Sequence, residues 1–116
     1  MTCTGSCHCG AVQVELAQAP TQIGVCNCSL CVKLGVRWAY YQQAETRISG
    51  ALTSYRRADK TAPSLEVMRC TVCGCVSHWQ PLDGRTRLGI NVHLLPPEIL
   101  AGVPVQLIDG RAWPIQ

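Results

Sequence analysis

Three cysteines lie within six residues of the chain, at Cys26, Cys28 and Cys31. Because Cys28 and Cys31 are three positions apart, a single helical turn or tight loop would bring both sulfurs to one metal ion. Zinc prefers four ligands, and a zinc ion with three protein ligands keeps its fourth position for water or substrate. The triplet therefore predicts an open zinc site that could perform chemistry.

Two cysteine pairs flank this triplet along the chain. Cys7 and Cys9 form a Cys-x-Cys pair, and Cys70 and Cys73 form a Cys-x2-Cys pair. Each pair can chelate locally, and a metal that joins them closes a loop of roughly sixty residues, which stabilises the fold. Four thiolates suit zinc or iron. Because the spacing matches neither a rubredoxin-like site nor an iron–sulfur cluster, we predict a closed, structural zinc site.

A fourth protein ligand would close the triplet and make it a second structural site. The candidates are Cys3, Cys75, His78 and His93. Cys75 is the strongest of them, because it follows the second cysteine pair by only two residues. With that ligand the chain would be a non-enzymatic zinc module that is structural or binds a partner protein. The fourth position of the triplet's metal is what separates this alternative from an enzyme.

Composition predicts one globular domain over residues 1–116, since 47% of the residues are apolar and 15% are charged. The N-terminus shows no export signal, and no apolar run approaches the roughly 20 residues that span a bilayer. We therefore expect a cytoplasmic protein with no membrane partner. In that reducing compartment, the odd number of nine cysteines indicates metal ligands rather than disulfides.

The formal charge of +3 does not indicate a nucleic-acid partner. Seven metal-bound thiolates (−7) and two zinc ions (+4) would change the charge by −3 and bring it to zero. The chain also lacks the basic stripe interleaved with aromatic residues that is typical of nucleic-acid binding. The small basic cluster of Arg56, Arg57 and Lys60 is interpreted as a solvated turn.

Short strands must position these cysteines. Val12, Val14 and Leu16 alternate with polar residues, which is the period of a half-buried strand over residues 11–16. Further strands are predicted at 36–42, 65–69, 76–79, 86–91 and 103–108, and the segments 46–49 and 52–56 are predicted to pair as a hairpin around Gly50. Helical turns are expected only at 29–34 and 97–101. The sequence therefore predicts a mainly β fold.

The combined motifs resemble the glutathione-dependent formaldehyde-activating enzyme family, also called the CENP-V/GFA domain. The residues that carry the resemblance are Gly5 to Val12, the Cys-x-Cys-x2-Cys triplet, the Cys70–Gly74 knuckle and the tail from Asn91 to Trp113. The resemblance implies an Mss4-like fold of several small coiled β-sheets, stapled by zinc. It also implies a structural zinc on the two cysteine pairs and a catalytic zinc on the triplet. Many members carry a hydroxyl or small residue where this chain has Cys75.

The resemblance further implies an activity. The family's proposed reaction joins glutathione and formaldehyde to S-(hydroxymethyl)glutathione, and formally it is a carbon–sulfur lyase reaction that runs either way. A small-molecule thiol is then the expected partner. Glutathione carries two carboxylates, for which Lys33 and Arg37, just after the triplet, are the candidate cations. Trp38 shares a strand face with Tyr40 and is the candidate pocket wall. The oligomeric state is left open.

Overall fold

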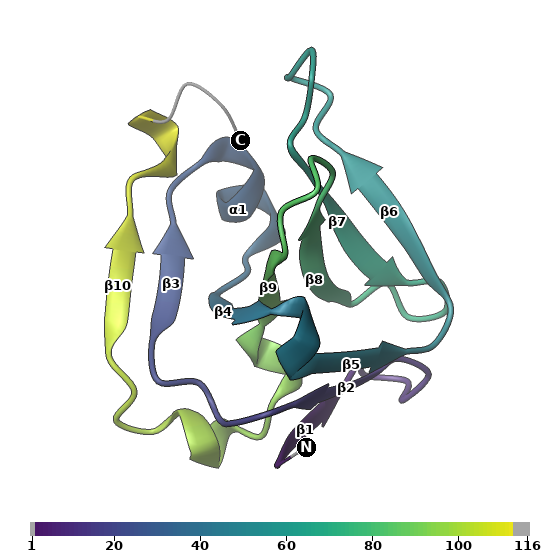
Figure 1. The fold of residues 1–116 in the computed structure, drawn as a ribbon, viewed down its shortest axis with the longest axis vertical. Helices are drawn as coiled ribbons and strands as arrows, with labels where there is room; N and C mark the ends of the chain where they lie inside the picture. Colours follow the sequence, from purple (N-terminus) through teal and green to yellow (C-terminus); the bar gives the residue numbers. More distant parts are fainter. Residues whose placement is uncertain (1, 113–116) are drawn as a thin grey trace.

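The computed structural model describes residues 2–112, which form ten strands in two sheets and one α-helix. A three-stranded sheet has the order β1-β2-β5, and a seven-stranded sheet has the order β10-β3-β4-β9-β8-β7-β6 (Figure 1). The strands are β1 Cys3–Ser6, β2 Gln13–Leu16, β3 Ile23–Cys26, β4 Trp38–Gln42, β5 Thr46–Ser49, β6 Leu52–Arg56, β7 Leu65–Cys70, β8 Val76–Pro81, β9 Arg87–Asn91 and β10 Val105–Ile108.

The helical structure is short, as predicted. Helix α1 covers Ser29–Leu34, and 3₁₀ turns cover Gln43–Glu45, Val92–Leu94, Pro97–Leu100 and Gly110–Ala112. The prediction of a mainly β fold with few helical turns is confirmed. Within residues 2–112 no helix has the length and apolar character needed to cross a membrane. Trp113, at the end of the tail motif, lies outside the described residues.

The main core lies where the three-stranded sheet packs against the middle of the seven-stranded sheet. Val14 and Leu16 of β2 are completely buried, as their alternation predicts. They pack with apolar side chains of β4 and β9, namely Ala39, Tyr41, Leu88 and Ile90. These two central strands run antiparallel, with Trp38 opposite Asn91. The core thus fixes β4 and β9, whose other residues face the candidate site.

The predicted hairpin around Gly50 is wrong. Strand β5 pairs with β2 in the small sheet, whereas β6 pairs with β7 in the large one. Gly50 has a φ of 111°, and a Cβ atom there would collide with the backbone oxygen of Ala11. Only glycine fits this close approach. The chain therefore runs close to the backbone just before β2. At Gly50 it passes from the three-stranded sheet into the seven-stranded sheet instead of forming a hairpin.

Strands β1 and β3 were not among the predicted strands. Strand β3 has no polar–apolar alternation, because it lies between β4 and the parallel strand β10 and is buried along most of its length. Its burial has a consequence for the triplet: β3 ends at Cys26, so the first cysteine of the triplet starts from an interior strand.

Candidate metal centres and the adjoining cavity

The first candidate metal centre joins the two sheets. Its candidate ligands Cys7 and Cys9 lie in the turn after β1 of the small sheet, Cys70 ends β7 of the large sheet, and Cys73 lies in the turn that follows. The four sulfurs all lie within 4.8 Å of one another. The structure thus brings the two predicted pairs together, into a group that could hold a metal ion. Cys7 and Cys70 belong to a small buried cluster that also includes Val12, whereas Cys9 is exposed.

Two sulfur–sulfur distances in this four-cysteine cluster are close to those found around a tetrahedral zinc ion. Cys9 lies 3.6 Å from Cys7 and 3.6 Å from Cys70, sulfur to sulfur. Thiolates bound to a tetrahedral zinc at about 2.3 Å lie about 3.8 Å apart. Backbone N–H groups of Val12 and Val72 also donate to the cluster, to Cys7 at 3.2 Å and to Cys70 at 3.3 Å. Donors aimed at sulfur stabilise a thiolate.

The four thiols of this cluster differ in how readily they ionise. Hydrogen bonds from the N–H groups of Cys75 and Cys9 lower the pKa of Cys73 to about 5. In contrast, burial and the three neighbouring thiols outweigh an N–H bond from Ala11 and raise the pKa of Cys9 to about 12. Without a positive ion, one thiol ionises at the expense of another. A divalent cation would remove this repulsion and allow all four thiols to ionise.

The triplet forms a second candidate metal centre. Cys26 ends β3, Cys28 is the N-cap of α1, and Cys31 lies one turn into that helix. Their sulfurs lie within 4.8 Å of one another. The N–H of Cys31 donates to the Cys28 sulfur at 3.4 Å, and the indole N–H of Trp38 donates to the Cys31 sulfur at 3.3 Å. The predicted helical turn over 29–34 is confirmed, and its start, together with the end of β3, brings the three sulfurs together.

Ionisation is unequal within the triplet as well. Burial opposes the ionisation of Cys28, but hydrogen bonds from Cys31 and Cys26 and the positive charge of Arg57 outweigh it and lower the pKa. Burial raises the pKa of Cys31, and the neighbouring Cys28 and Cys26 raise it further, although Trp38 donates to its sulfur. Three adjacent sulfurs, one of them with a lowered pKa, are a suitable donor set for a divalent cation that binds thiolates.

Of residues 2–112, no fourth His, Cys, Asp or Glu side chain lies within 4.8 Å of all three triplet sulfurs. Cys75 lies beside the four-cysteine cluster, where it contacts Cys73 and the backbone of His8. His78 is buried, and its two ring nitrogens contact Ser77 and Gln80. Cys3 is buried in the main core. Cys75 thus lies at the four-cysteine cluster. None of Cys75, His78 and Cys3 is placed as a fourth ligand of the triplet.

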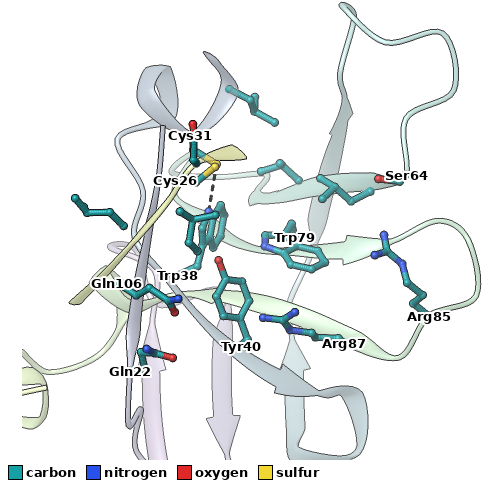
Figure 2. Close-up of a pocket in the computed structure, with 16 residues that line it drawn as sticks. Gln22, Cys26, Cys31, Trp38, Tyr40, Ser64, Trp79, Arg85, Arg87 and Gln106 are labelled. Atoms are coloured by element: carbon teal, nitrogen blue, oxygen red, sulfur yellow. Dashed lines mark hydrogen bonds between the residues drawn. The ribbon is translucent and has the colours of Figure 1, made fainter. Parts of the chain in front are cut away.

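A cavity of about 540 Å³ opens next to the triplet. Cys26 and Cys31 lie at one end of it, above Trp38 and Tyr40, while Trp79 and the two arginines Arg85 and Arg87 lie toward the other (Figure 2). The Tyr40 and Trp79 rings are 6.2 Å apart. The cavity therefore has sulfur at one end, aromatic walls along its length and positive charge at the far end.

Gly89 allows Trp79 to form part of this wall. It lies opposite Trp79 in the pairing of β8 with β9, and a Cβ atom at this position would overlap the indole ring. The absence of a side chain lets the indole lie across β9 beside Tyr40. The side chains of β4 and β8 can then form one continuous aromatic surface.

The cations of the cavity differ from those that the sequence suggested. Trp38 lines the cavity, whereas Lys33 is exposed on α1 and neither it nor Arg37 is among the lining residues. Arg85 and Arg87 line the cavity instead, and the Arg87 guanidinium carbon lies 4.2 Å from the centre of the Tyr40 ring. The Arg-x-Arg spacing at the start of the strand predicted over 86–91 is the signal that could have identified them, because alternate residues share a face.

The basic cluster of Arg56, Arg57 and Lys60 is only partly the solvated turn that the sequence suggested, because Arg56 is exposed but Arg57 is buried. Arg57 is only 6% exposed. Its guanidinium donates to Asp59 at 2.7 Å and to the Ser29 hydroxyl at 3.1 Å, and it also contacts the Cys28 thiol. The prediction failed because a long-range contact with α1 covers this side chain.

The C-terminal segment contacts the residues of the triplet region through strand pairing and hydrogen bonds. Strand β10 pairs in parallel with β3 and places Ile108 beside Cys26. Just beyond, the Asn27 side chain donates to Asp109 at 2.8 Å and accepts from the Arg111 N–H at 2.9 Å. Asn27, between two cysteines of the triplet, is therefore held by residues more than eighty positions away.

Comparison with known proteins agrees with the motifs. The family model described as glutathione-dependent formaldehyde-activating enzyme matches residues 2–98. The chain belongs to this family. A solved structure of a Rhodobacter sphaeroides protein is similar to this GFA chain, with 29% sequence identity and a TM-score of 0.69. The match covers 89% of this chain and 99% of the other. Both candidate metal centres lie inside the range that the family model matches.

Proposed function

We propose that this GFA chain is a zinc-dependent enzyme of the carbon–sulfur lyase type that acts on thiol adducts. The observation that carries the proposal is the triplet beside the cavity: three sulfurs able to hold one ion, two of them lining a space of about 540 Å³. A volume in this range is typical of small-molecule sites. The candidate reaction is the reversible formation of S-(hydroxymethyl)glutathione from glutathione and formaldehyde.

The reaction is simple in terms of bonds. The sulfur of the thiol attacks the aldehyde carbon, a carbon–sulfur bond forms, the carbonyl becomes a hydroxyl group, and the thiol proton ends on that oxygen. A free thiol is mostly protonated at neutral pH, and only the thiolate is a good nucleophile. Zinc on Cys26, Cys28 and Cys31 would supply the missing step by deprotonating a thiol at its fourth position.

Tyr40 is suited to hold the oxygen that changes during this reaction. Its ring lines the cavity beneath the triplet (Figure 2), and no hydrogen bond joins its hydroxyl to another of the described residues. Burial raises the pKa of Tyr40 to about 12, so the hydroxyl stays protonated at neutral pH and can donate. A donor aimed at the aldehyde oxygen stabilises the negative charge that develops there.

The two arginines are suited to hold the other end of the substrate. Arg87 is kept in place by its contact with the Tyr40 ring, and Arg85 is held by Asp83 at 2.8 Å. A guanidinium binds a carboxylate through paired hydrogen bonds. A thiol that carries a carboxylate, such as glutathione, would therefore lie along the aromatic wall with its sulfur at the triplet.

The four-cysteine cluster has a different role in this proposal. It links β1 of the small sheet to β7 of the large sheet and lies apart from the cavity, since none of its cysteines is a lining residue. A second zinc there would stabilise the fold and take no part in the reaction.

Cobalt substitution tests the proposal directly. With Co²⁺ at the triplet, the ligand-field bands are expected to shift when glutathione or a simple thiol is added, because the fourth position accepts an exchangeable ligand. Since a bound thiol loses its proton, the uptake should strengthen as the pH rises toward the pKa of the free thiol. The measurement is a thiol titration followed by visible absorption at several pH values.

The Cys75→Ala variant provides the control for this titration. If the wild-type spectrum ignores thiols and the variant responds, Cys75 closes the site and the chain is a structural zinc module. If neither responds, the proposed thiol chemistry is wrong. If simple thiols bind as tightly as glutathione, the metal chemistry stands but glutathione is not the preferred substrate.

The arginines give a second expected result. Arg87→Ala should raise the KM for glutathione about 10- to 100-fold, since a hydrogen bond to a charged group contributes roughly 1.5–3 kcal/mol. The KM for an uncharged thiol such as 2-mercaptoethanol should not change, because it offers no carboxylate. Steady-state kinetics with both thiols on wild type and variant provide the comparison.

Two further variants sharpen this comparison. Arg47→Ala, on the small sheet in an exposed ion pair with Glu15, controls for the loss of one positive charge. Lys33→Ala tests the cation on α1 that the sequence suggested. A larger effect from Lys33→Ala than from Arg87→Ala would move the carboxylate site to α1 and contradict the orientation proposed here.

A further inference from the structure

Arg57 is the one arginine of this segment that the fold buries. It follows β6 directly and is 6% exposed, whereas the side chain of its neighbour Arg56 is 61% exposed and pairs with Glu66. Burying a guanidinium is costly unless it is paired and hydrogen-bonded. The position of Arg57 therefore needs partners that compensate this cost.

Two parts of the described chain contribute partners to Arg57. Within its own segment, Arg57 donates to both carboxylate oxygens of Asp59, at 2.9 Å and 2.7 Å. This bond is the largest cause of the low pKa of Asp59, about 2, so the pair stays ionised at neutral pH. From α1, the Ser29 hydroxyl accepts from the same guanidinium at 3.1 Å, and the Cys28 thiol contacts it.

The Arg57 guanidinium thus connects the start of α1 with the connection between β6 and β7. On one side it contacts Cys28, a predicted metal ligand, and the first residue of α1. On the other side it is clamped to the connection between β6 and β7, which protrudes above the large sheet (Figure 1). Ser64 and Leu65, at the end of this connection, line the cavity. Arg57 therefore contacts both the predicted ligand Cys28 and the segment that leads into one wall of the cavity.

The charge of Arg57 matches the charge of a loaded site. Three thiolates (−3) and one divalent ion (+2) leave a net charge of −1 next to the guanidinium. Such a charge pair is strong where the surroundings exclude water. Residues that contact metal ligands in this way orient them and tune the affinity for the metal.

We propose that Arg57 is a positioning residue of the triplet metal site, which fixes Cys28 and the start of α1 and couples metal occupancy to the order of the segment 57–64. The inference rests on the proposed function only in requiring that the triplet holds zinc. It adds that the wall of the cavity formed by Ser64 and Leu65 is ordered when the metal is bound. Loss of the metal would loosen that wall.

Zinc affinity of full-length variants tests the positioning role. Arg57→Met keeps a buried apolar stem but removes the charge and the donors, and it should weaken zinc binding at the triplet about 10- to 100-fold. Arg57→Lys keeps the charge but loses the planar fork, so its loss should be smaller. Competition with a chromophoric chelator gives the affinities, and the four-cysteine cluster should retain its own ion in each variant.

Hydrogen exchange tests the coupling. In the zinc-loaded wild type, the amides of 57–64 should exchange more slowly than in Cys28→Ser, which lacks a triplet ligand. The same amides should lose protection in Arg57→Met. The control is Arg56→Met, the exposed neighbour, which should match wild type in zinc affinity and in exchange. A merely structural Arg57 would lower the melting temperature without changing zinc affinity.

The outcomes separate the two proposals. If Arg57→Met and Arg57→Lys bind zinc at the triplet as tightly as wild type, the proposed role of Arg57 is wrong. The proposed function is then unaffected, because the wild-type triplet still binds zinc. Equal exchange of 57–64 in loaded wild type and Cys28→Ser overturns the coupling. A wild type that takes up only one zinc ion overturns the proposed function, and this inference with it.

Discussion

Cys70→Ser is expected to unfold the protein. Cys70 is almost completely buried, and its sulfur accepts hydrogen bonds from the N–H groups of Val72 and Cys73, at 3.3 Å and 3.5 Å. Metal binding at a closed thiolate site contributes on the order of 10 kcal/mol to folding in small peptides. That is comparable to the whole free energy of unfolding of a typical domain, about 5–15 kcal/mol. Removing one ligand of this site should therefore abolish a cooperative melt.

Circular dichroism and thermal melting provide the measurement for Cys70→Ser, and Cys75→Ser is the matched control. Cys75 lies five residues later, in the connection between β7 and β8, but is not one of the four clustered sulfurs. Its replacement should leave the melting transition and the zinc content close to those of wild type. A Cys70→Ser protein that still melts cooperatively near the wild-type temperature would mean that the four-cysteine cluster does not stabilise the fold.

Local patterns predicted the parts of the site that are local in the chain. The spacing of Cys28 and Cys31 indicated a helical turn, and the structure has α1 over Ser29–Leu34. The alternation of Val12, Val14 and Leu16 indicated a buried strand face, and all three are completely buried. The two cysteine pairs were expected to meet, and their sulfurs do gather at one place. The helical turn and the buried strand face each have their physical cause within a few residues. The meeting of the two cysteine pairs, some sixty positions apart, was instead expected because each pair supplies two ligands for the same metal ion.

Features that depend on distant partners could not be read in this way. Arg57 looked solvated because its neighbours are polar, but contact with α1, 28 positions earlier, buries it. Gly50 looked like a hairpin turn, but the backbone oxygen of Ala11 determines how the chain passes it. The cavity cations were sought next to the triplet, whereas β9 brings Arg87 from some sixty positions away to the same cavity.

The same distinction guides the design of a variant that removes metal chemistry without disturbing the fold. Cys28 has two local roles, since its sulfur is a predicted metal ligand and also the N-cap acceptor for the N–H of Cys31. Serine is among the best N-cap residues. Cys28→Ser therefore replaces one N-cap with another and should retain α1, while the triplet loses one of its three sulfurs.

Cys28→Ser is accordingly expected to be folded but inactive. Its zinc content should fall from two ions per chain to one, and its rate with glutathione and formaldehyde should fall to the uncatalysed rate. The reason is that a thiol without a metal remains mostly protonated at neutral pH. Elemental analysis, the melting temperature and exchange spectroscopy of the adduct by nuclear magnetic resonance provide the three measurements.

Comparison with Cys70→Ser decides between the two roles proposed for the cysteine clusters. If Cys28→Ser loses its zinc and its activity but keeps a cooperative melt, one cluster supports the fold and the other supports the reaction. If it collapses as Cys70→Ser is expected to do, both clusters are structural and the chain is a zinc module without catalysis. If it loses the triplet zinc but keeps its full rate, the metal of the triplet takes no part in the reaction, although Cys26 and Cys31 line the cavity.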